Sequence, residues 1–557
     1  MKSALDCVVI GYNDPPLSFH EHRIMAQDEM SPERRVFMRE HLMVDGIRRA
    51  PMDVINHYAE RFLGVGPDPY YHVGEVPNLA AVYLASYLRR QGHAAEYVSL
   101  FRPEQGALTE LLECRPRVVA ITTTFYLMPW PVQEICQFVR AASPGSHIVV
   151  GGPLIDNLVA DLPAETLRDV FEWIDADSYV KESQGEATLG SLVGTLIAGG
   201  DPAQVPNLYV RSGQGFRFTR ARPERNDLDE CTIDWGLCDP GGLGLTVQTR
   251  TARSCAFKCS FCDFPVRAGA LSVASVAAVE RELRQLARRG VRHLVFVDDT
   301  FNVPIGRFKD LCQMMIANDF GFEWYSFFRS SAARDTEIYD LMQHSGCRAV
   351  FLGIESGDDS VLRNMTKSSS TDQYRFAVEQ LHQRGITTFA SFICGFPGET
   401  EKSLRNTISF INEIQPTFYR AELWFYNHRS PIHEQAQALG LTGQGYDWKH
   451  ATMDSALGAD AADELFRDVT GSTWMPGYNY DFWAVPYLRG KGLTMSEIVG
   501  LQSIISSLIP FNSASTADPA SEETRLRQLQ ALQAWFSSVA MSEPRYRLAL
   551  EASAAAG

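Results

Sequence analysis

Apolar and polar positions alternate in short blocks over the first 198 residues. Short apolar runs such as CVVIGY predict buried strands, and the amphipathic stretches between them predict helices. Strands that alternate with helices indicate an α/β fold with a parallel, doubly wound sheet, whose ligand site lies at the carboxyl ends of the strands. The predicted strands are 7–12, 95–100, 118–123, 147–150 and 178–181, and the predicted helices are 79–90, 106–113 and 132–142.

One polar stretch interrupts this alternation of strands and helices, and a second polar stretch follows it. Residues from about 14 to 76 are polar and helix-prone, which indicates an inserted helical segment inside the first domain. Residues 199–242 are rich in glycine, proline, arginine and aspartate, and they predict a linker with a short hairpin.

A second alternating series follows the linker. Six strand–helix units in about 180 residues predict a partial (β/α)6 barrel, because a complete eight-stranded barrel typically needs about 250 residues. From 431 onward the pattern becomes mostly helical. The expected domains are therefore 1–198, 199–242, 243–430 and 431–557. The predicted barrel strands are 245–250, 293–297, 324–328, 349–354, 387–393 and 418–424, with helices such as 275–289 and 371–384.

Charge and cysteine usage narrow the function classes. The formal net charge is −16, so no nucleic acid partner is expected, since a phosphate backbone is bound by a basic face. No apolar run of membrane-spanning length is present, and the N-terminus has no signal-peptide core, so we expect a protein without membrane association. Three of the 11 cysteines fall close together, which favours a reducing cytoplasm and one cysteine-based site.

The three clustered cysteines directly follow the first predicted barrel strand. Cys255, Cys259 and Cys262 have the spacing CxxxCxxC. Three thiolates on one loop suit a 4Fe–4S cluster in which each binds one iron, and the fourth iron stays open for a small molecule. The alternative is a structural zinc with Cys231 or Cys238 as the fourth ligand, although zinc sites favour CxxC pairs.

From about 245 to 424 the sequence resembles the radical SAM superfamily. In that family three such cysteines hold the cluster, and the open iron binds S-adenosylmethionine (SAM). The resemblance is carried by the ends of successive strands, although many members have Gly-Gly-Glu where this chain has Asp-Asp-Thr at 298–300. The SAM contacts that it implies are Phe261 for the adenine, Asp298 and Asp299 for the methionyl amine, Arg329 for the carboxylate, Glu355 and Ser356 for the ribose, and Gly395 and Glu399 beside the adenine.

The first domain resembles the cobalamin-binding domain of the cobalamin-dependent radical SAM branch. The segment PNLAAVYL at 77–84, Gly-Gly-Pro at 151–153 and QGEAT at 184–188 match its pattern. Small turns let a flat corrin approach the strand ends. A flavodoxin-like fold without ligand, or with a nucleotide, is the alternative, although no GxGxxG follows the first strand. The cobalamin contacts that the resemblance implies are Thr122, Thr123, Gly151, Gly152, Pro153, Gly185 and Glu186.

The whole chain is most similar to radical SAM methyltransferases of antibiotic pathways. It resembles the P-methyltransferases of phosphinate antibiotics and the tryptophan C-methyltransferases of thiopeptide pathways. This implies methyl transfer from SAM through methylcobalamin to an unactivated phosphorus or carbon centre of a small metabolite or amino acid. An external electron donor, such as flavodoxin or ferredoxin, is then expected.

Other functions remain open from the sequence. One is a cobalamin-containing radical SAM cyclase or rearrangement enzyme, and another is a tRNA- or protein-modifying radical SAM enzyme without cobalamin. A third is a cobalamin-sensing regulatory protein with a zinc module. A polar methyl transfer would need a base near the substrate. The candidates for that base are Glu422, His428, His433, His450 and Asp454.

Overall fold

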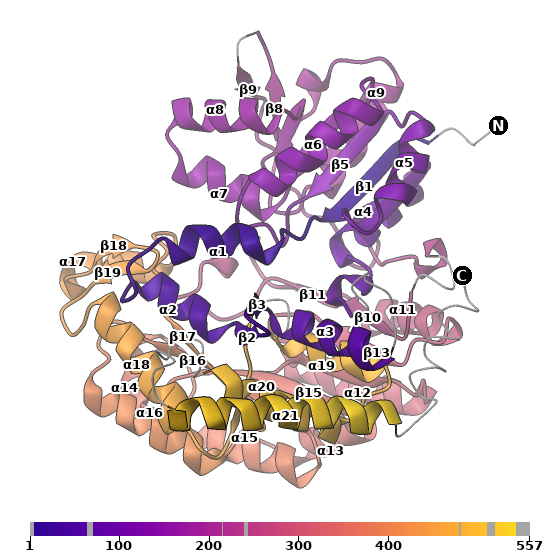
Figure 1. Cartoon of the computed structure of the whole chain (residues 1–557). Helices are drawn as coiled ribbons and strands as arrows, with labels where there is room; N and C mark the ends of the chain where they lie inside the picture. Colours follow the sequence, from indigo (N-terminus) through magenta and orange to yellow (C-terminus); the bar gives the residue numbers. More distant parts are fainter. Residues whose placement is uncertain are drawn as a thin grey trace. The chain divides into compact units, whose positions relative to one another are not determined.

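The structure is a computed structural model that describes residues 5–63, 71–213, 215–238, 243–477, 481–509 and 519–541 (Figure 1). The chain divides into two compact units. The first contains residues 1–16, 74–242 and 277–286, and the second contains residues 17–73, 243–276 and 287–557. The polar segment that interrupts the first domain in sequence thus belongs to the second unit.

The first unit is built on a seven-stranded sheet. Its first five strands pair in parallel, and the last two are antiparallel, so the predicted doubly wound sheet is confirmed. In β5 every residue is buried, as expected for a parallel strand with helices on both faces. The strands in spatial order are β4 (Ala95–Leu100), β1 (Cys7–Tyr12), β5 (Val118–Thr122), β6 (His147–Gly151), β7 (Ser178–Val180), β8 (Leu208–Arg211) and β9 (Phe216–Phe218).

Two hydrophobic clusters cover the two faces of this sheet. They involve the helices that lie beside the sheet in Figure 1. α4 (Leu79–Arg90) and α9 (Glu186–Ile197) contribute to one cluster. The other includes residues of α5 (Gln105–Glu113), α6 (Trp130–Ala142), α7 (Pro153–Asp161) and α8 (Ala164–Ile174). The strand order reverses between β1 and β5. The loops after these strands therefore border the topological switch point, where α/β sheets bind ligands.

The second unit contains the partial barrel. Its seven parallel strands lie side by side in sequence order, and the six predicted strands agree with the structure to within two residues at each end. The seventh, β20 (Thr473–Trp474), was not predicted. The strands are β10 (Thr246–Thr249), β13 (His293–Phe296), β14 (Glu323–Phe327), β15 (Cys347–Glu355), β16 (Thr387–Cys394), β17 (Phe418–Leu423) and β20.

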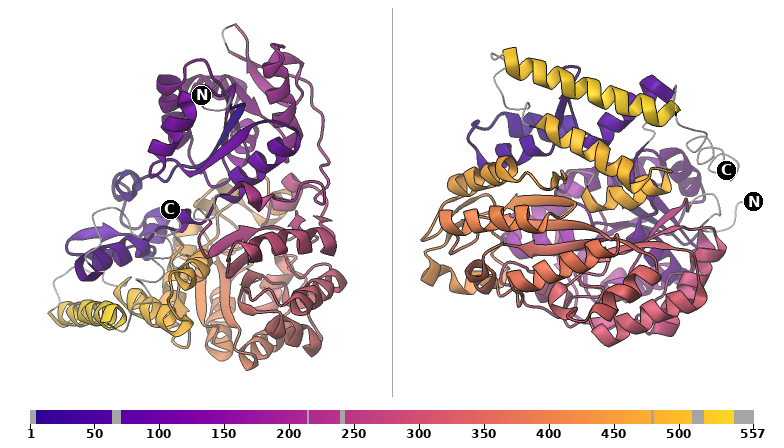
Figure 2. Two further views of the ribbon diagram at one scale, coloured as in Figure 1. Left: turned by 90° about the vertical axis from the view of Figure 1, so that its right-hand side faces the viewer. Right: turned by 90° about the horizontal axis from the view of Figure 1, so that it is seen from below.

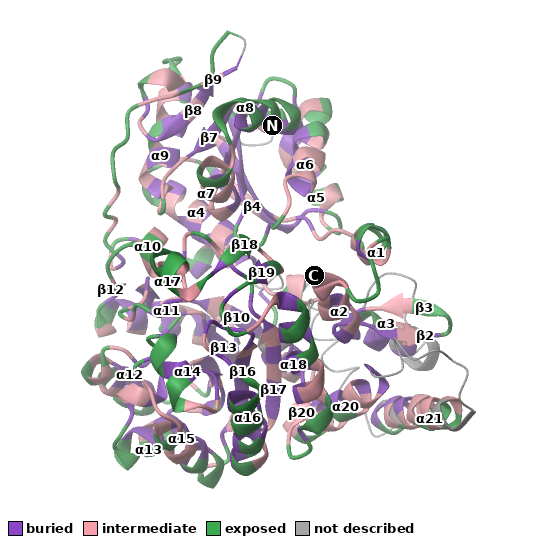
Figure 3. Ribbon diagram, turned by 90° about the vertical axis from the view of Figure 1, so that its left-hand side faces the viewer, coloured by how far each residue is buried: buried purple, intermediate pink, exposed green. Residues whose placement is uncertain are grey.

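Helices between these strands have exposed outer surfaces, whereas the strands are mostly buried (Figure 3). Capping boxes at Ser370 and Thr400 define where two of the helices begin. The helices are α12 (Ile305–Asn318), α13 (Thr336–His344), α14 (Asp359–Asn364), α15 (Thr371–Gln383) and α16 (Glu401–Ile414). The predicted helix 275–289 corresponds to α11 (Val276–Arg288).

The inserted and C-terminal segments pack together in the second unit. α2 (Pro32–Arg39) contacts α18 (Ser455–Asp468), and α3 (Pro51–Leu63) contacts α21 (Pro519–Met541). Figure 2 shows α20 (Met495–Leu508) beside α21. The C-terminal region is mostly helical, as predicted, but it also contains the hairpin of β18 (Thr442–Gln444) and β19 (Asp447–Lys449).

Candidate active site

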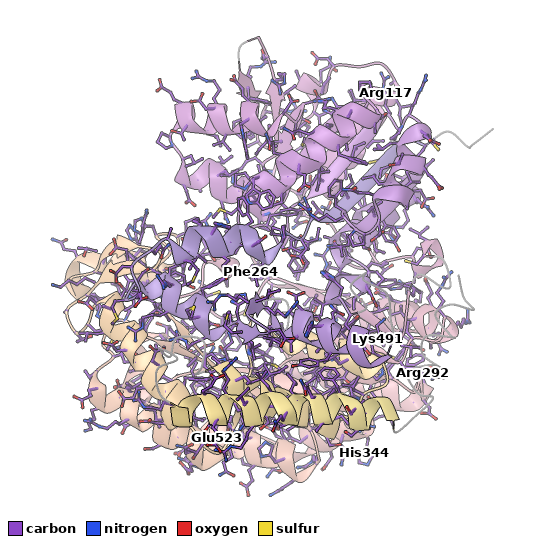
Figure 4. The ribbon with its side chains drawn as sticks, viewed as in Figure 1. Arg117, Phe264, Arg292, His344, Lys491 and Glu523 are labelled. Carbon is purple, nitrogen blue, oxygen red and sulfur yellow. The ribbon has the colours of Figure 1, made fainter. Side chains whose placement is uncertain are left out.

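The three cysteines lie on an irregular loop between β11 (Ala252–Arg253) and α10 (Phe264–Ala268). Neighbouring segments fix this loop through Ser260, whose N–H donates to Met365 O at 2.9 Å and whose Oγ donates to Asn364 O at 2.8 Å. In Figure 4 the labelled Phe264, just after the loop, lies at the opposite end of this unit from His344, which precedes β15. The loop therefore lies at the carboxyl ends of the barrel strands, where barrel enzymes have their active sites.

The thiols of this loop have polar neighbours. Cys255 Sγ lies 3.8 Å from Thr300 Oγ1, and Arg329 Nη1 lies 3.8 Å from Cys259 Sγ. Burial raises the pKa of Cys262 to about 11, so a bound cation is needed to hold it as a thiolate at neutral pH. Among the described residues, no three His, Cys, Asp or Glu side chains form a group that could hold one metal ion. A cubane cluster needs no such group, because each cysteine binds a different iron.

Arg329, at the end of β14, is almost fully buried beside the cysteine loop. Its guanidinium carbon lies 4.0 Å from the centre of the Phe257 ring. Asn302 holds its backbone from both sides, because Arg329 N donates to Asn302 Oδ1 at 2.8 Å and Asn302 Nδ2 donates to Arg329 O at 2.9 Å. Arg329 Nη2 is buried and has no hydrogen-bond partner within the described ranges. A guanidinium held in this way suits a carboxylate ligand.

The two aspartates after β13 have different surroundings. Asp298 is buried, and its carboxylate accepts hydrogen bonds from Thr251 N at 2.6 Å, from Ala252 N at 2.9 Å and from Thr251 Oγ1. Both oxygens of Asp298 are thereby occupied by the turn before the cysteine loop. Asp299 is accessible to solvent, but desolvation by the surrounding protein, with the charge of Asp298, raises its pKa to about 7. Asp299 therefore has the free carboxylate.

The end of β15 brings together the predicted ribose contacts. Glu355 is buried with a backbone φ of +71°, and its Oε1 accepts a 2.7 Å hydrogen bond from Lys367 Nζ. Burial alone would lower the pKa of Lys367, but the charge of Glu355, together with those of Tyr374 and Cys259, outweighs burial and raises this pKa. Ser356 is fully buried, and its Oγ accepts from Asp358 N at 3.1 Å and lies 3.3 Å from Thr407 Oγ1. Ser356 thus serves the turn itself.

The loop after β16 carries Gly395 and Glu399. Glu399 is buried and accepts a 2.6 Å hydrogen bond from Gly395 N, and burial raises its pKa to about 7. Gly395 has a φ of +89°, and a Cβ there would lie 2.4 Å from the Trp448 ring. The predicted adenine neighbour Phe261 lies edge-to-face with Phe396 of this loop, with centroids 6.4 Å apart. The structure therefore brings the two predicted adenine segments together.

Residues that follow the β18–β19 hairpin, in the C-terminal region, pack against the loop that carries Gly395 and Glu399. His450 is buried, with Nε2 3.0 Å from Gly395 O and its ring stacked on Trp448. Thr452 Oγ1 accepts from Gly398 N at 3.3 Å. Burial lowers the pKa of His450, which therefore stays neutral at pH 7. His450 is thus a structural neighbour of the adenine segment, a contact that its position in the sequence did not indicate.

The other candidate bases also have partners. Asp454 caps α18 by accepting from Leu457 N at 3.0 Å. Tyr426 OH lies 2.6 Å from His433 Nδ1, and the rings of His428 and His433 stack. Glu422 pairs with Arg420, both on β17.

Alternation along β17 places Glu422 on the inner face of the barrel. The neighbouring residues Tyr419 and Leu423 are buried, and Tyr419 OH donates to Phe466 O of α18 at 3.2 Å. Side chains alternate between the two faces of a strand, so Arg420 and Glu422 point away from α18. Both side chains remain partly accessible. Of the five candidate bases, Glu422 thus has the position best suited to face a substrate.

In the first unit, Thr123 and Gly152 form a closely packed pair at the carboxyl ends of β5 and β6. Thr123 Oγ1 donates to Gly151 O at 2.9 Å and accepts from Leu154 N at 3.2 Å. Gly152 has a φ of +109°, and a Cβ on it would lie 2.9 Å from Thr123 Oγ1. Pro153 then begins α7. Glycine is therefore required at position 152 by the close approach of the two chain segments, and we refer to these strand ends as the Thr123–Gly152 cradle.

Gly185 and Glu186 begin α9, but the glutamate points inward. Gly185 has a φ of +79°. Glu186 is buried and accepts a 2.5 Å hydrogen bond from Tyr83 OH of α4. The N-terminus of α9 is capped instead by Glu224, which accepts from Ala187 N at 3.0 Å and from Thr188 N at 2.7 Å. No local pattern pointed to Glu224.

An apolar patch lies beside this cradle on the loop between β5 and α6. Phe125 is 54% exposed and Leu127 is 92% exposed. Phe125 packs edge-to-face on Tyr12 at the end of β1, with ring centroids 5.9 Å apart. Large exposed apolar side chains at a topological switch point suit an extended, partly apolar ligand.

Comparison with known proteins agrees with this geometry. Residues 249–411 match the radical SAM superfamily. An uncharacterized methyltransferase of Pyrococcus horikoshii is 26% identical over 353 residues, which cover 61% of this chain and 73% of the relative. The anaerobic magnesium-protoporphyrin IX monomethyl ester cyclase of Rubrivivax gelatinosus is 24% identical over 462 residues, covering 76% and 79%. No helix of the described part is long and apolar enough to cross a membrane.

Two solved structures share the fold over most of the chain. The radical SAM methyltransferase TsrM of Kitasatospora setae, solved with cobalamin and a [4Fe-4S] cluster, has a TM-score of 0.56 at 17% identity and covers 82% of this chain and 97% of its own. The cobalamin-dependent radical enzyme OxsB, solved with aqua-cobalamin, has a TM-score of 0.56 at 14% identity and covers 91% and 90%. The predicted resemblance is thereby confirmed: residues 249–411 match the radical SAM superfamily, and most of the chain has the fold of these two cobalamin-dependent radical SAM enzymes.

Proposed function

We propose that the chain is a cobalamin-dependent radical SAM methyltransferase. It would methylate an unactivated phosphorus or carbon centre of a small metabolite or amino acid, such as a phosphinate phosphorus or a tryptophan carbon, in antibiotic biosynthesis. The observation that carries the proposal is the pairing of two sites on one chain. One is the cysteine loop with buried Arg329 at the barrel mouth, and the other is the Thr123–Gly152 cradle.

The residues of the barrel mouth fit a cluster and SAM. Cys255, Cys259 and Cys262 would hold the cluster. The unpartnered Nη2 of Arg329 would take the methionyl carboxylate, and the accessible carboxylate of Asp299 would take the amine. When bound, the cluster supplies the electron that cleaves SAM to a 5′-deoxyadenosyl radical, and cobalamin carries the methyl group. An external donor such as flavodoxin or ferredoxin would supply the electrons.

The remaining SAM contacts follow from the loops after β15 and β16. Glu355 would accept hydrogen bonds from the ribose hydroxyls, because only one of its oxygens is used by Lys367. Phe261 and the Gly395–Glu399 turn would bind the adenine, with Gly395 kept free of a side chain by the Trp448 ring. Asp298 and Ser356 would act indirectly, since both side chains hold the turns on which these ligands depend.

The cradle of the first unit fits a corrin. Thr122, Thr123, Gly151, Gly152 and Pro153 leave the strand ends free of bulky side chains, and the exposed Phe125 would cover apolar edges of the ring. Gly185, which has no side chain, would let the corrin approach the start of α9. Glu186 would act indirectly, because its carboxylate accepts the hydrogen bond of Tyr83 OH on α4. These residues bind and orient the cofactor, and they exclude water from it.

Product mass tests the proposal. The anaerobically reconstituted enzyme is incubated with SAM that carries a deuterated methyl group, a reductant and either a phosphinate amino acid or L-tryptophan. The product should be heavier than its substrate by one labelled methyl group and should form only when cobalamin is present. Formation of a methylated product without cobalamin would contradict the proposal.

A second candidate function is radical cyclisation or rearrangement without methyl transfer. The similarity to the anaerobic cyclase of Rubrivivax gelatinosus over 76% of this chain favours it. A cyclase would change the substrate without adding the labelled methyl group. The same mass measurement therefore separates the two functions.

A further inference from the structure

Lys367 is a buried charged residue to which the proposed function assigns no role. Its side chain is only 6% exposed, and the side chain of Glu355 is 9% exposed. Lysine is seldom buried unless it is paired, because desolvating an ammonium is costly. The Lys367 Nζ to Glu355 Oε1 hydrogen bond of 2.7 Å supplies that pairing. The pair lies at the carboxyl end of β15.

The backbone next to both residues of the Lys367–Glu355 ion pair adopts unusual conformations. Thr366 and Ser368, on either side of Lys367, both have positive φ angles of +51° and +52°, as does Glu355 at +71°. Such conformations are costly for residues other than glycine and persist where the surrounding structure enforces them. A Cβ at Gly353 would lie 2.5 Å from Glu355 Oε1 and 3.1 Å from Lys367 Nζ. Glycine at 353 therefore leaves room for the ion pair.

The ion pair uses only part of each group. Within the described ranges, Glu355 Oε2 has no hydrogen-bond partner, and Glu355 Oε1 is the one acceptor of Lys367 Nζ. The Phe261 ring lies below the ammonium, with its centre 5.3 Å from Nζ. One glutamate oxygen is thus fixed by a charge-assisted hydrogen bond, and the other is free for a ligand.

We propose that Lys367 is a positioning residue that holds the Glu355 carboxylate in place to accept hydrogen bonds from the ribose hydroxyls of SAM. This rests on the proposed function, because it requires SAM at the barrel mouth. Lys367 itself does not touch the ligand. It fixes the rotation of the carboxylate so that Oε2 faces the diol, and a ligand without hydroxyls gains nothing from it.

The test compares two ligands on the enzyme with its reconstituted cluster. Dissociation constants are measured by anaerobic equilibrium dialysis for SAM and for an analogue that lacks both ribose hydroxyls. Lys367→Met should weaken SAM binding about tenfold, in line with loss of a charge-assisted hydrogen bond, and should change binding of the analogue by less than about twofold. Lys367→Arg should recover part of the loss. The matched control is Lys309→Met, since Lys309 also pairs with carboxylates but is more exposed.

A second background separates positioning from folding. In Glu355→Gln the carboxylate is absent, so adding Lys367→Met should leave the affinity for SAM unchanged within about twofold. Equal losses for SAM and the analogue, or the same loss in both backgrounds, would overturn the proposal. Iron content and melting temperature identify any variant that does not fold. If the unmodified enzyme binds iron but no SAM, the proposed function itself fails.

Discussion

Asp298 offers the sharpest test of how the barrel mouth is built. Its carboxylate accepts three hydrogen bonds from Thr251 and Ala252, immediately before the cysteine loop. Asp298→Ala leaves these three donors buried and unpaired. Each such donor costs about 1–3 kcal/mol, so together they should lower the free energy of unfolding by about 3–9 kcal/mol. That is a large part of the roughly 5–15 kcal/mol that stabilises a typical protein.

The assay compares Asp298→Ala with Asp299→Asn. Urea unfolding of the apoprotein and iron uptake should both be impaired in Asp298→Ala. Asp299→Asn should be at least as stable as the unmodified protein at pH 7, because the raised pKa of Asp299 means that folding disfavours its charge. It should retain iron and bind SAM more weakly, because it loses the charge that pairs with the methionyl amine. Normal stability and iron content in Asp298→Ala, together with lost SAM affinity, would refute the assignment.

Three further predictions concern the cluster, the corrin and a buried acid. Cys259→Ala should abolish both iron binding and SAM cleavage, and retained cleavage would contradict the cluster assignment. Gly152→Ala should weaken cobalamin binding at unchanged iron content, because its Cβ would lie 2.9 Å from Thr123 Oγ1; spectroscopic titration with hydroxocobalamin checks this, and unchanged affinity would count against the cradle. Burial raises the pKa of Glu399 from 4.5 to about 7, so the folded protein holds this proton more tightly than the unfolded chain does. The free energy of unfolding should therefore fall as the pH rises from about 4.5 to 7, by at most about 1.4 kcal/mol per pH unit. Unfolding curves of Glu399→Gln should lack this fall, and an unchanged pH profile would contradict it.

The elements that position the sites were predictable because their signals are local. Apolar runs such as 118–123 read as buried strands, and the order of strands and helices determines a parallel sheet. The cysteine spacing predicts the cluster ligands, and Gly152, Phe261 and Glu399 were singled out through the family resemblance at successive strand ends. Their roles as ligand contacts stay predictions.

The contacts that support these residues depend on pairs far apart in sequence. Glu224 caps a helix 36 residues earlier through Thr188, and Lys367 pairs with Glu355 across the short helix α14. β20 contains two residues, too few for a period. Asp298 was expected to contact SAM, but its oxygens are used by a neighbouring turn. Side-chain partners of this kind follow from tertiary packing, which local periodicity does not encode.

The central claim is that one chain holds both an iron–sulfur cluster and cobalamin. The most direct measurement is metal analysis with absorbance spectroscopy after anaerobic reconstitution with iron, sulfide and hydroxocobalamin. The reconstituted protein should contain about four irons and about one cobalt per chain, and Cys259→Ala should lose the iron and retain the cobalt. Zinc in place of iron, or iron without cobalt, would contradict it.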